Sequence, residues 1–215
     1  SAHISDQQTG GKGRNGKKWI SPKGRNIYIS LGWKSSLLFS QLEGLSLAVG
    51  TVLANTLNQY TENQIRIKWP NDILFKKRKM SGILIENLDL EGKVGVVIGI
   101  GINIHMTDEE GKEIDQSWIS LDEATNKINN RNKIITDLLN GLFRLTERFP
   151  SKGFKHFKSS FEKLDLLKGK ECKVISEHDT KEVKVLGVND KGELLIKENK
   201  EYLSLRYGEV SIREL

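Results

Sequence analysis

The segment 10–18, which reads GGKGRNGKK, combines four glycines with four cationic side chains. Glycine can adopt positive φ, so several backbone N–H groups of such a segment can turn toward one anion. Lysine and arginine add charge-assisted hydrogen bonds to phosphate or carboxylate oxygens. Because the segment has almost nothing apolar to bury, we expect it to be disordered when empty and to close on its ligand. The composition predicts a mobile loop that holds a phosphate-bearing ligand; a solvated surface loop with incidental charge is the alternative.

The loop differs from a Walker A motif, because its spacing is wrong and Lys18 is followed by Trp19 and not by Ser or Thr.

A second group of polar residues is found at 68–72, KWPND. Pro70 favours an extended Trp69, and Asn-Asp favours a turn. This pattern puts a lysine, an amide and a carboxylate at the end of a central strand, where loops often carry function. The alternative is a strand end with a packed tryptophan and a turn.

Two apolar segments contain glycines that could admit a ligand. In 79–84, KMSGIL, Lys79 enters an apolar strand, which usually marks a solvated edge, but Gly82 permits close approach by a ligand or another backbone. The segment 99–103, GIGIN, differs from a dinucleotide fingerprint because a third glycine and a following helix are missing. We interpret it as a buried strand whose glycines leave room for a ligand, with Asn103 as a polar contact.

The elements that position these residues follow from hydrophobic periodicity and turn chemistry. Strands are predicted at 2–6, 26–33, 64–69, 80–88 and 93–104, and helices from the Ser40 capping box to about Tyr60, at 121–127, at 132–149 and over a segment with Phe154, Phe157, Phe161 and Leu164. Pro150 is expected to end the third of these helices. Helices and strands occur in blocks, which favours an α+β fold with a mixed or antiparallel sheet.

The pattern changes after Lys168, where short alternating segments predict strands at 172–176, 183–188, 194–197, 202–205 and 210–213. The sequence Asn-Asp-Lys-Gly at 189–192 predicts a hairpin turn between two of them. Short strands of this kind suggest a small barrel. We therefore expect a domain boundary near residues 165–168.

Bulk composition narrows the class of protein. The chain has 215 residues, 34 Lys and Arg, 28 Asp and Glu, and one cysteine, Cys172. The net charge of +6 suits anionic ligands, but a nucleic-acid-binding protein more often segregates its cations onto one stripe. One cysteine excludes an intramolecular disulfide, and no Cys/His cluster suggests a structural zinc. No apolar run could span a membrane and no secretory leader is evident, so a cytoplasmic location is expected.

The order of these segments resembles the biotin protein ligase family. The elements QTGGKGRNGKKW, NIYIS, KWPNDI, KMSGIL, GIGINI and the late Ser117-Trp118 occur in the family's order over essentially the whole chain. The resemblance implies a fold like that of class II aminoacyl-tRNA synthetases over residues 1–166, with a mixed sheet and helices. It implies an SH3-like barrel over residues 167–215.

The resemblance also implies an activity. Members of the family use ATP to activate biotin as biotinyl-5′-adenylate, and then transfer biotin to a lysine of a biotin carboxyl carrier protein. The first step joins two anions, so it needs cations on the reacting groups and Mg²⁺ on the phosphates. The adenylate hydrolyses easily, so it needs a lid that excludes water.

Residue roles are carried over by position. The resemblance implies that Arg14, Lys79, Lys68 and Asp72 are catalytic, that Gln8, Lys12, Gly13, Arg14, Lys79 and Gly82 bind biotin, and that Lys17, Asn71, Asn103, Trp118 and Arg213 bind ATP or the adenylate. Within this set, Asp72 is the candidate to orient or deprotonate the acceptor lysine. No protein metal ligand is assigned.

The sequence departs from the family in three respects. A Ser-Thr-Asn type segment usually precedes the loop, but the chain starts at Ser1, so we expect a truncated N-terminus. A helix-turn-helix domain is not found in these residues, so DNA binding is not assigned. Lys12 and Lys17 stand where arginines are usual and lose the planar fork. Family dimers pair sheet edges near the loop, and the segment 26–30 is a candidate edge.

Two alternative functions remain open at this stage. A lipoate or octanoate ligase of the same fold would adenylate a different acid. A nucleic-acid-binding module would use the cationic loop on phosphates, and its affinity would fall steeply with salt.

Overall fold

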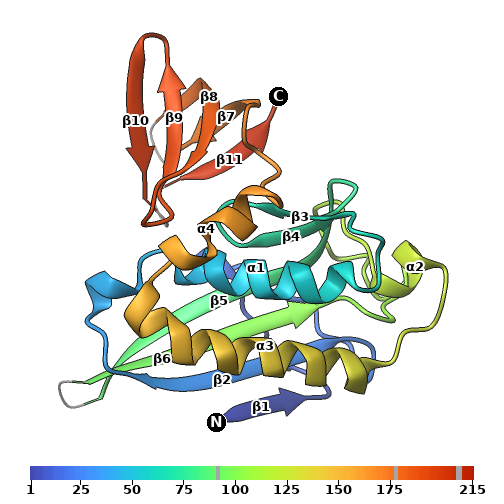
Figure 1. The fold of residues 1–215 in the computed structure, drawn as a ribbon. Coiled ribbons are helices and arrows are strands. Elements are labelled where there is room, and N and C mark those ends of the chain that lie inside the picture. The colour runs from blue at the N-terminus through green and yellow to red at the C-terminus, as the bar shows by residue number, and fades with distance from the viewer. Residues whose placement is uncertain (91–92, 177–178, 207–209) are drawn as a thin grey trace.

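The computed structural model describes residues 1–90, 93–176, 179–206 and 210–215, which form two antiparallel sheets and a layer of helices (Figure 1). The larger sheet has the order β1-β2-β6-β5-β4-β3, and the smaller has the order β10-β9-β8-β7-β11. Helices α1, α3 and α4 cover one face of the larger sheet, and the smaller sheet stands beside its β3–β4 end. These two sheets and the few helices confirm the predicted α+β class.

The first part of the chain supplies the larger sheet and all the helices. Its strands are β1 (Ala2–Ser5), β2 (Ile27–Ser35), β3 (Ile65–Lys68), β4 (Asp72–Phe75), β5 (Arg78–Leu90) and β6 (Lys93–Ile102). Its helices are α1 (Leu45–Asn58), α2 (Leu121–Thr125), α3 (Arg131–Lys152) and α4 (Lys155–Glu162), with short 3-10 turns η1 (Arg14–Gly16) and η2 (Phe39–Leu42). Within the described residues, none of these helices combines the length and apolar character needed to cross a membrane.

The helix-covered face of the larger sheet is apolar because isoleucines occupy alternate strand positions. Ile67, Ile73 and Ile83 are at most 2% exposed. A Cβ on Gly50 of α1 would lie 3.5–3.7 Å from methyl groups of these three side chains, so the helix backbone packs directly on them. Each buried isoleucine side chain contributes roughly 1.5–3 kcal/mol, and together they fix the register of the strands.

The opposite face of the same strands is polar and glycine-rich. Antiparallel registers place Lys68 opposite Asp72, Asp72 opposite Gly82, Gly82 opposite Gly101 and Gly101 opposite Tyr28. Residues that are directly opposite in an antiparallel pair share a face, so these five residues form one row across five strands. We call it the floor row. It has a charged pair at one end, two glycines in the middle and a buried tyrosine at the other end.

The type of sheet was predicted correctly, but not all of its strands were. All pairs between named strands are antiparallel, and the parallel contacts are the isolated bridges Ile67↔Asp165 and Lys79↔Trp118. Strand β4 was not predicted, because Asp72 was assigned to a turn and the remaining strand is only four residues long. The proposed edge at 26–30 is wrong, since β1 pairs with β2 over Tyr28–Leu31 and β6 pairs with its other side.

The prediction that a Ser40 capping box begins the first long helix is wrong. Residues 39–42 form the separate turn η2, in which the backbone N–H of Leu38 donates to Gln41 Oε1 at 2.9 Å. Gly44 then adopts φ 74°, and a Cβ there would lie 2.5 Å from Phe154. This left-handed residue changes the chain direction, so α1 begins only at Leu45.

The prediction that Pro150 ends its helix is also wrong, because α3 continues to Lys152. Proline lacks the N–H that would bond the carbonyl four residues earlier, but only two helical residues follow it. The helix ends at Gly153, which has φ 58° and donates its N–H to Phe149 O at 2.8 Å. The following helix, α4, is where the phenylalanine spacing predicted it.

The smaller sheet confirms the five predicted strands, β7 (Glu171–Ile175), β8 (Thr180–Val188), β9 (Leu194–Glu198), β10 (Glu201–Leu205) and β11 (Ser211–Glu214). The turn at 189–192 is closed by a hydrogen bond from Gly192 N to Asn189 O at 3.1 Å. The same turn meets the larger sheet, where the buried Trp69 indole donates from Nε1 to Gly192 O at 3.1 Å. Apolar packing is continuous between the two sheets, and the exact domain boundary stays a prediction.

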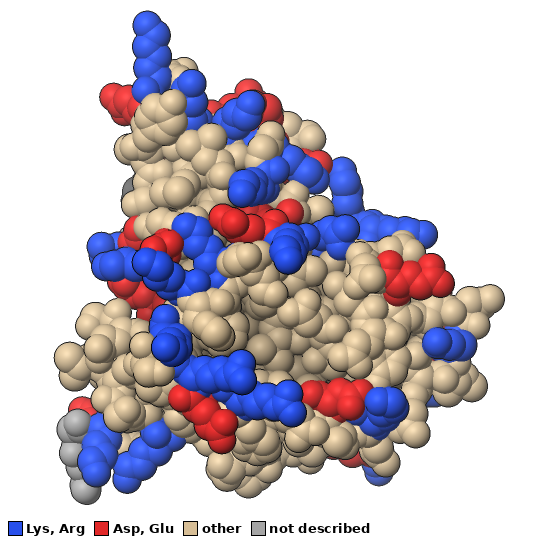
Figure 2. Space-filling model, viewed as in Figure 1, with Lys and Arg blue, Asp and Glu red and all other residues tan. Residues whose placement is uncertain are grey.

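Charged side chains on the helix-covered side are mixed in sign. Figure 2 shows Lys and Arg interspersed with Asp and Glu over this face, with no continuous basic stripe. This face therefore offers no continuous basic surface to a nucleic-acid backbone.

Candidate active site

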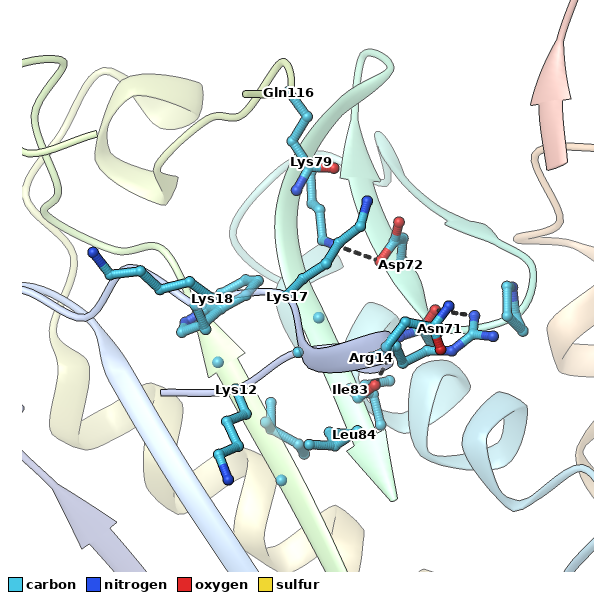
Figure 3. Close-up of a pocket in the computed structure, with 18 of the residues that line it drawn as sticks. Lys12, Arg14, Lys17, Lys18, Asn71, Asp72, Lys79, Ile83, Leu84 and Gln116 are labelled. Atoms are coloured by element: carbon cyan, nitrogen blue, oxygen red, sulfur yellow. Dashed lines mark hydrogen bonds and ion pairs between the residues drawn. The ribbon is translucent and has the colours of Figure 1, made fainter. Parts of the chain in front are cut away.

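A cavity of about 1250 Å³ lies on the polar side of the larger sheet, beneath the loop 10–18 (Figure 3). Its lining includes every residue that the sequence predicted for the site: Gln8, Lys12, Gly13, Arg14, Lys17, Lys68, Asn71, Asp72, Lys79, Gly82, Asn103, Trp118 and Arg213. These residues come from the loop, four strands of the larger sheet or their ends, the segment before α2, and β11 of the smaller sheet. The structure therefore brings together residues as far apart in sequence as Gln8 and Arg213, while their individual roles stay predictions.

The centre of the floor row is covered by Trp19, which the sequence analysis did not assign to the site. A Cβ on Gly101 would lie 2.5 Å from the Trp19 ring, and one on Gly82 would lie 3.1 Å from it. The space left by the strand glycines therefore holds an indole, whereas the sequence interpretation gave it to a ligand. Trp19 Nε1 is buried and has no hydrogen-bond partner within the described residues. The sequence feature that could have indicated a site role for Trp19 is its position directly after the cationic loop.

The loop 10–18 forms a compact hairpin. Lys12 and Lys18 form a bridge, Gly13 N donates to Lys17 O at 2.6 Å, and Trp19 N donates to Gly11 O at 2.9 Å. Positive φ values at Asn15 and Gly16 turn the chain at its tip. Disorder without ligand stays a prediction.

Arg14 is linked to the sheet through Asn71. Arg14 Nη1 donates to Asn71 Oδ1 at 3.3 Å, and Asn71 Nδ2 donates to Ile83 O at 2.8 Å (Figure 3). Both polar atoms of the Asn71 side chain are thus engaged by protein, which makes it a support for the loop as well as a lining residue. Gln8 is held in a similar way, because its Oε1 accepts from Ser21 Oγ at 3.1 Å.

The charged end of the floor row is a cluster of one carboxylate and three cations. Lys79 Nζ lies 2.7 Å from Asp72 Oδ1, with the side chains 17% and 25% exposed, and 5.6 Å from the Trp19 ring centroid. Burial lowers the pKa of Lys68 from its ordinary value; the Asp72 charge opposes this, while Lys79 and Arg213 add to it. Burial and like charge therefore make the Lys68 ammonium easier to deprotonate than that of an exposed lysine.

The segment 103–122 forms the wall near Trp118. The buried Asn103 donates from Nδ2 to Ile119 O at 3.5 Å, and its own carbonyl accepts from Leu121 N at 2.9 Å. The Trp118 ring packs directly against Gly111 and leaves no room for a Cβ there. Backbone bonds to β5 add to these contacts, because Asn103 N donates to Met80 O at 2.9 Å and Arg78 Nε donates to Trp118 O at 3.0 Å.

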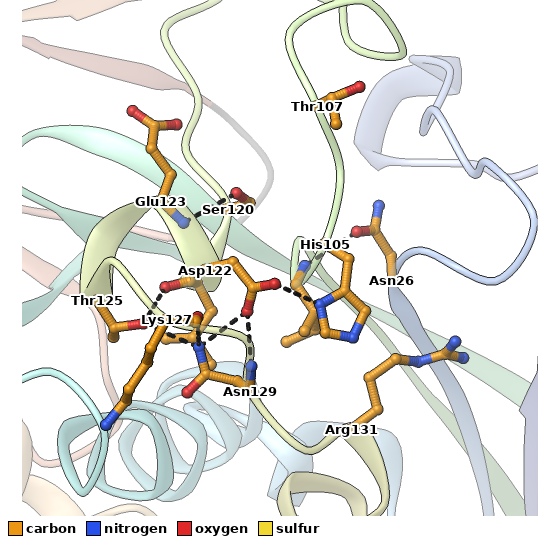
Figure 4. A network of polar contacts seen from close by, with 12 residues as sticks. Asn26, His105, Thr107, Ser120, Asp122, Glu123, Thr125, Lys127, Asn129 and Arg131 are labelled. Atoms are coloured by element: carbon orange, nitrogen blue, oxygen red, sulfur yellow. Dashed lines mark hydrogen bonds and ion pairs between the residues drawn. The ribbon is translucent and has the colours of Figure 1, made fainter.

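A polar network anchors this segment on its far side (Figure 4). His105 Nδ1 lies 2.6 Å from Asp122 Oδ2, and Asp122 Oδ1 accepts from both N and Nδ2 of Asn129 at 2.9 Å. Ser120 caps α2 by accepting from Glu123 N at 3.4 Å. The network holds α2, and through it the carbonyl of Asn103, against the end of β6.

Acidic residues of the same segment were missed by the sequence analysis. Glu113 and Asp115 line the cavity, and Lys18 Nζ lies 2.8 Å from Glu113 Oε2. Both side chains of this pair are more than 70% exposed, so its net contribution to stability is small. Within the described part of the chain, no three His, Cys, Asp or Glu side chains are grouped to hold a metal ion.

Comparisons with known proteins match both parts of the chain. Residues 1–103 match the Biotin/lipoate A/B protein ligase family, and residues 168–213 match the Biotin protein ligase C terminal domain. The bifunctional ligase/repressor BirA of Escherichia coli is 36% identical over 99% of this chain and 66% of its own length. A biotin–[acetyl-CoA-carboxylase] ligase of Mycobacterium tuberculosis is 32% identical over 65% of this chain and 51% of its own length.

The fold agrees with solved structures of such enzymes. The biotin protein ligase of Aquifex aeolicus in complex with biotin and ATP superposes with a TM-score of 0.85 and 31% identity, covering 100% of this chain and 89% of the other. The chain spans 66% or less of the length of the BirA relatives from Escherichia coli and Bacillus subtilis. Family profile, sequence identity and fold agree, and the chain belongs to the biotin protein ligase family.

Proposed function

We propose that the protein uses ATP to activate biotin as biotinyl-5′-adenylate and transfers biotin to a lysine of a biotin carboxyl carrier protein. One observation carries the proposal: a row of strand glycines ends in the Asp72–Lys79 ion pair beneath an arginine-bearing loop. The floor suits the apolar ring of the acid, and the cations suit the carboxylate and phosphate that react. Family membership supports the same activity.

In the activation step, the biotin carboxylate attacks the α-phosphate of ATP and pyrophosphate leaves. Both reactants are anionic, so the barrier falls when fixed cations meet the charge that develops between them. Arg14 can hold the carboxylate and phosphate oxygens together with its planar fork, and Lys79 can contact the same oxygens. Lys12, Gly13, Gln8 and Gly82 would contact biotin.

The nucleotide would occupy the side of the cavity lined by the segment 103–118 and β11. Trp118 can cover the adenine face, Asn103 and Asn71 offer amides, and Arg213 and Lys17 add positive charge. The Trp19 indole must share or leave the glycine floor when biotin binds there, because the space above Gly101 is already filled.

Transfer requires a neutral amine on the acceptor. Asp72 would accept a hydrogen bond from the acceptor lysine and orient it toward the carbonyl carbon of the adenylate. Lys68, on the adjacent strand, would support this cluster.

Mg²⁺ is expected to arrive with the nucleotide. It binds proteins through one or two carboxylates plus substrate phosphates and keeps several waters, so a cage of three protein ligands is not required. Glu113 and Asp115 are the carboxylates of segment 103–118 on the cavity lining that could hold it. When bound, the ion would neutralise charge on the phosphates.

The wider assignments are proposals of the same kind. We propose that residues 1–166 form the catalytic domain and residues 167–215 an SH3-like domain, and that the protein acts in the cytoplasm. A homodimer would have to pair through a sheet edge other than β2.

A substrate comparison tests the function. Pyrophosphate release should depend on biotin and ATP, should stop when Mg²⁺ is chelated, and should be far slower with lipoate. Release with lipoate alone would instead assign the site to a lipoate ligase. Affinity for DNA or RNA that falls steeply with salt, without any pyrophosphate release, would favour a nucleic-acid-binding protein.

A further inference from the structure

Asn71, the residue before β4, is fixed to the larger sheet through both its backbone and its side chain. Its backbone carbonyl accepts from Ile83 N at 3.2 Å, and its side-chain Nδ2 donates to Ile83 O at 2.8 Å. The preceding residue is held from the helix side, where Ser46 Oγ of α1 donates to Pro70 O at 3.1 Å. Ile83 is buried against α1, and Asn71 itself is 9% exposed. The Asn71 side chain therefore has little freedom to move.

These contacts determine which atom of the Asn71 amide faces the loop. A carbonyl oxygen accepts hydrogen bonds and cannot donate them, so Nδ2 must be the atom that faces Ile83 O. Oδ1 is then directed toward the loop, where it accepts from Arg14 Nη1 at 3.3 Å (Figure 3). An amide oxygen pairs with a guanidinium but does not pair with a phosphate oxygen, since both of those oxygens are acceptors. The sheet thus presents a fixed acceptor that suits Arg14.

The tip of the loop has few other means of holding the Arg14 side chain in one place. Arg14 begins the turn η1, and none of the three residues of this turn is buried. Bonds within the loop, such as that from Gly13 N to Lys17 O at 2.6 Å, close the hairpin but do not attach it to the sheet. The Arg14–Asn71 bond is partly buried and joins the tip to the sheet. Because the guanidinium is charged, this bond is stronger than one between neutral groups.

Resting on the proposed function, we infer that Asn71 is a positioning residue that acts through Arg14. It holds the guanidinium at the sheet before the substrates bind, so less freedom is lost when the biotin carboxylate and the α-phosphate meet Arg14. The same bond keeps the loop closed and slows the escape of the adenylate. In this role Asn71 contributes to activation and retention without touching the nucleotide, and its effect disappears when Arg14 is absent.

A double-mutant cycle on the full chain tests whether Asn71 acts through Arg14. Biotinyl-adenylate release is measured by rapid dilution in the parent, in Asn71→Ala, in Arg14→Gly and in the double variant. Asn71→Ala should speed release about tenfold, near the lower end of what one charged hydrogen bond is worth. Added to Arg14→Gly, the same change should alter release by less than about twofold, because the guanidinium that Asn71 holds is already gone.

Tryptic cleavage reads the position of the loop without any substrate. Cleavage after Lys12, Lys17 and Lys18 is followed by mass, because these three sites remain in all four proteins. The loop must open before it is cut, so the cleavage rate follows the population of the open form. Asn71→Ala should raise this rate about tenfold, and the double variant should be cut no faster than Arg14→Gly.

Asn130→Ala is the matched control for a general loss of stability. Asn130 caps α3 by accepting from Lys133 N at 3.1 Å and does not line the cavity. Its removal should lower the free energy of unfolding, as the loss of a helix cap does, and leave adenylate release and loop cleavage unchanged. If Asn71→Ala does not fold, Asn71→Ser, which also lacks the amide oxygen, takes its place in every measurement.

The outcomes separate this inference from the proposed function. If Asn71→Ala speeds release by the same factor with and without Arg14, Asn71 acts on the ligand directly and the inference is overturned. Release and cleavage rates equal to those of the parent would overturn it as well, and either result leaves adenylate formation intact. If the parent forms no adenylate, the proposed function fails, and the cleavage rates still decide whether Asn71 holds Arg14.

Discussion

The two faces of the larger sheet are built from the same strands and do opposite things. On the helix-covered face, isoleucines such as Ile67, Ile73 and Ile83 fill the space beneath α1. On the cavity face, the residues adjacent to these isoleucines in sequence are Lys68, Asp72 and Gly82. Buried isoleucine side chains stabilise the helix-covered face. On the cavity face, the lack of side chains at the strand glycines makes the space that Trp19 occupies.

This difference means that the stability of the fold and the chemistry of the site can be changed separately. Because strand residues alternate between faces, a substitution acts on one face without repacking the other. Changes on the helix-covered face should therefore cost stability, whereas changes on the cavity face should cost activity.

The largest expected effect is on the cavity face. In Gly101→Val the new Cβ would meet the Trp19 ring at 2.5 Å, so the indole or the bound acid must move. Misplacement of this order costs about 100-fold in rate, which biotin-dependent pyrophosphate release would measure. Gly99→Ala is the control, because its Cβ would make ordinary contacts of 3.4 Å or more. If both variants lost activity equally, glycine spacing would not explain the floor.

The corresponding change on the helix-covered face is Ile83→Ala. It removes a side chain that is 2% exposed and should lower the free energy of unfolding by about 2–5 kcal/mol. Denaturant unfolding measures this, and kcat at a temperature where the variant remains folded should be retained. Loss of kcat without loss of stability would break the comparison between the faces.

A smaller effect is expected at the loop that covers the cavity face. Arg14→Gly removes the guanidinium bonded to Asn71 and with it the proposed contacts to the adenylate, each worth about 1.5–3 kcal/mol for a charged hydrogen bond. Biotinyl-adenylate should dissociate roughly tenfold faster or more and modify lysines of unrelated proteins. Release measured by rapid dilution checks this, and unchanged retention would argue against a lid role for Arg14.

The smallest effect is expected where the loop meets the acidic wall. Glu113→Gln breaks an exposed pair with Lys18, so the free energy of unfolding should change by less than about 1 kcal/mol. Glu109→Gln, which breaks the exposed pair with Lys112 in the same segment, is the matched control. A thermal shift clearly larger than that of the control would show that this contact holds the loop more firmly than its exposure suggests.

The same contrast explains what the sequence could predict. Alternating isoleucines and short apolar segments were enough to predict most strands of the two sheets. The order of the motifs was enough to predict site residues that all line the cavity. The position of Trp19 on Gly82 and Gly101 was not predictable, because a loop residue met two strands far along the chain. Strand β4 was missed because four residues starting at Asp72 give too short a pattern. The start of α1 after Gly44 was not predictable, because it depends on packing against Phe154. The end of α3 was misplaced because Pro150 lies in the last helical turn, where a proline is tolerated.

The hydrogen bond between Trp69 and Gly192 has a consequence for biosynthesis. Trp69 precedes Asn71 and Asp72 by only a few residues, and its buried indole is held by a turn that is synthesised more than a hundred residues later. Arg213, on the last described strand, adds a further piece of the cavity wall. A nascent chain that has emerged only as far as α4 would thus hold most of the lining residues without the support behind them. We expect a ribosome-bound intermediate of that length to form no adenylate, so that the reactive intermediate would first be made by a completed chain.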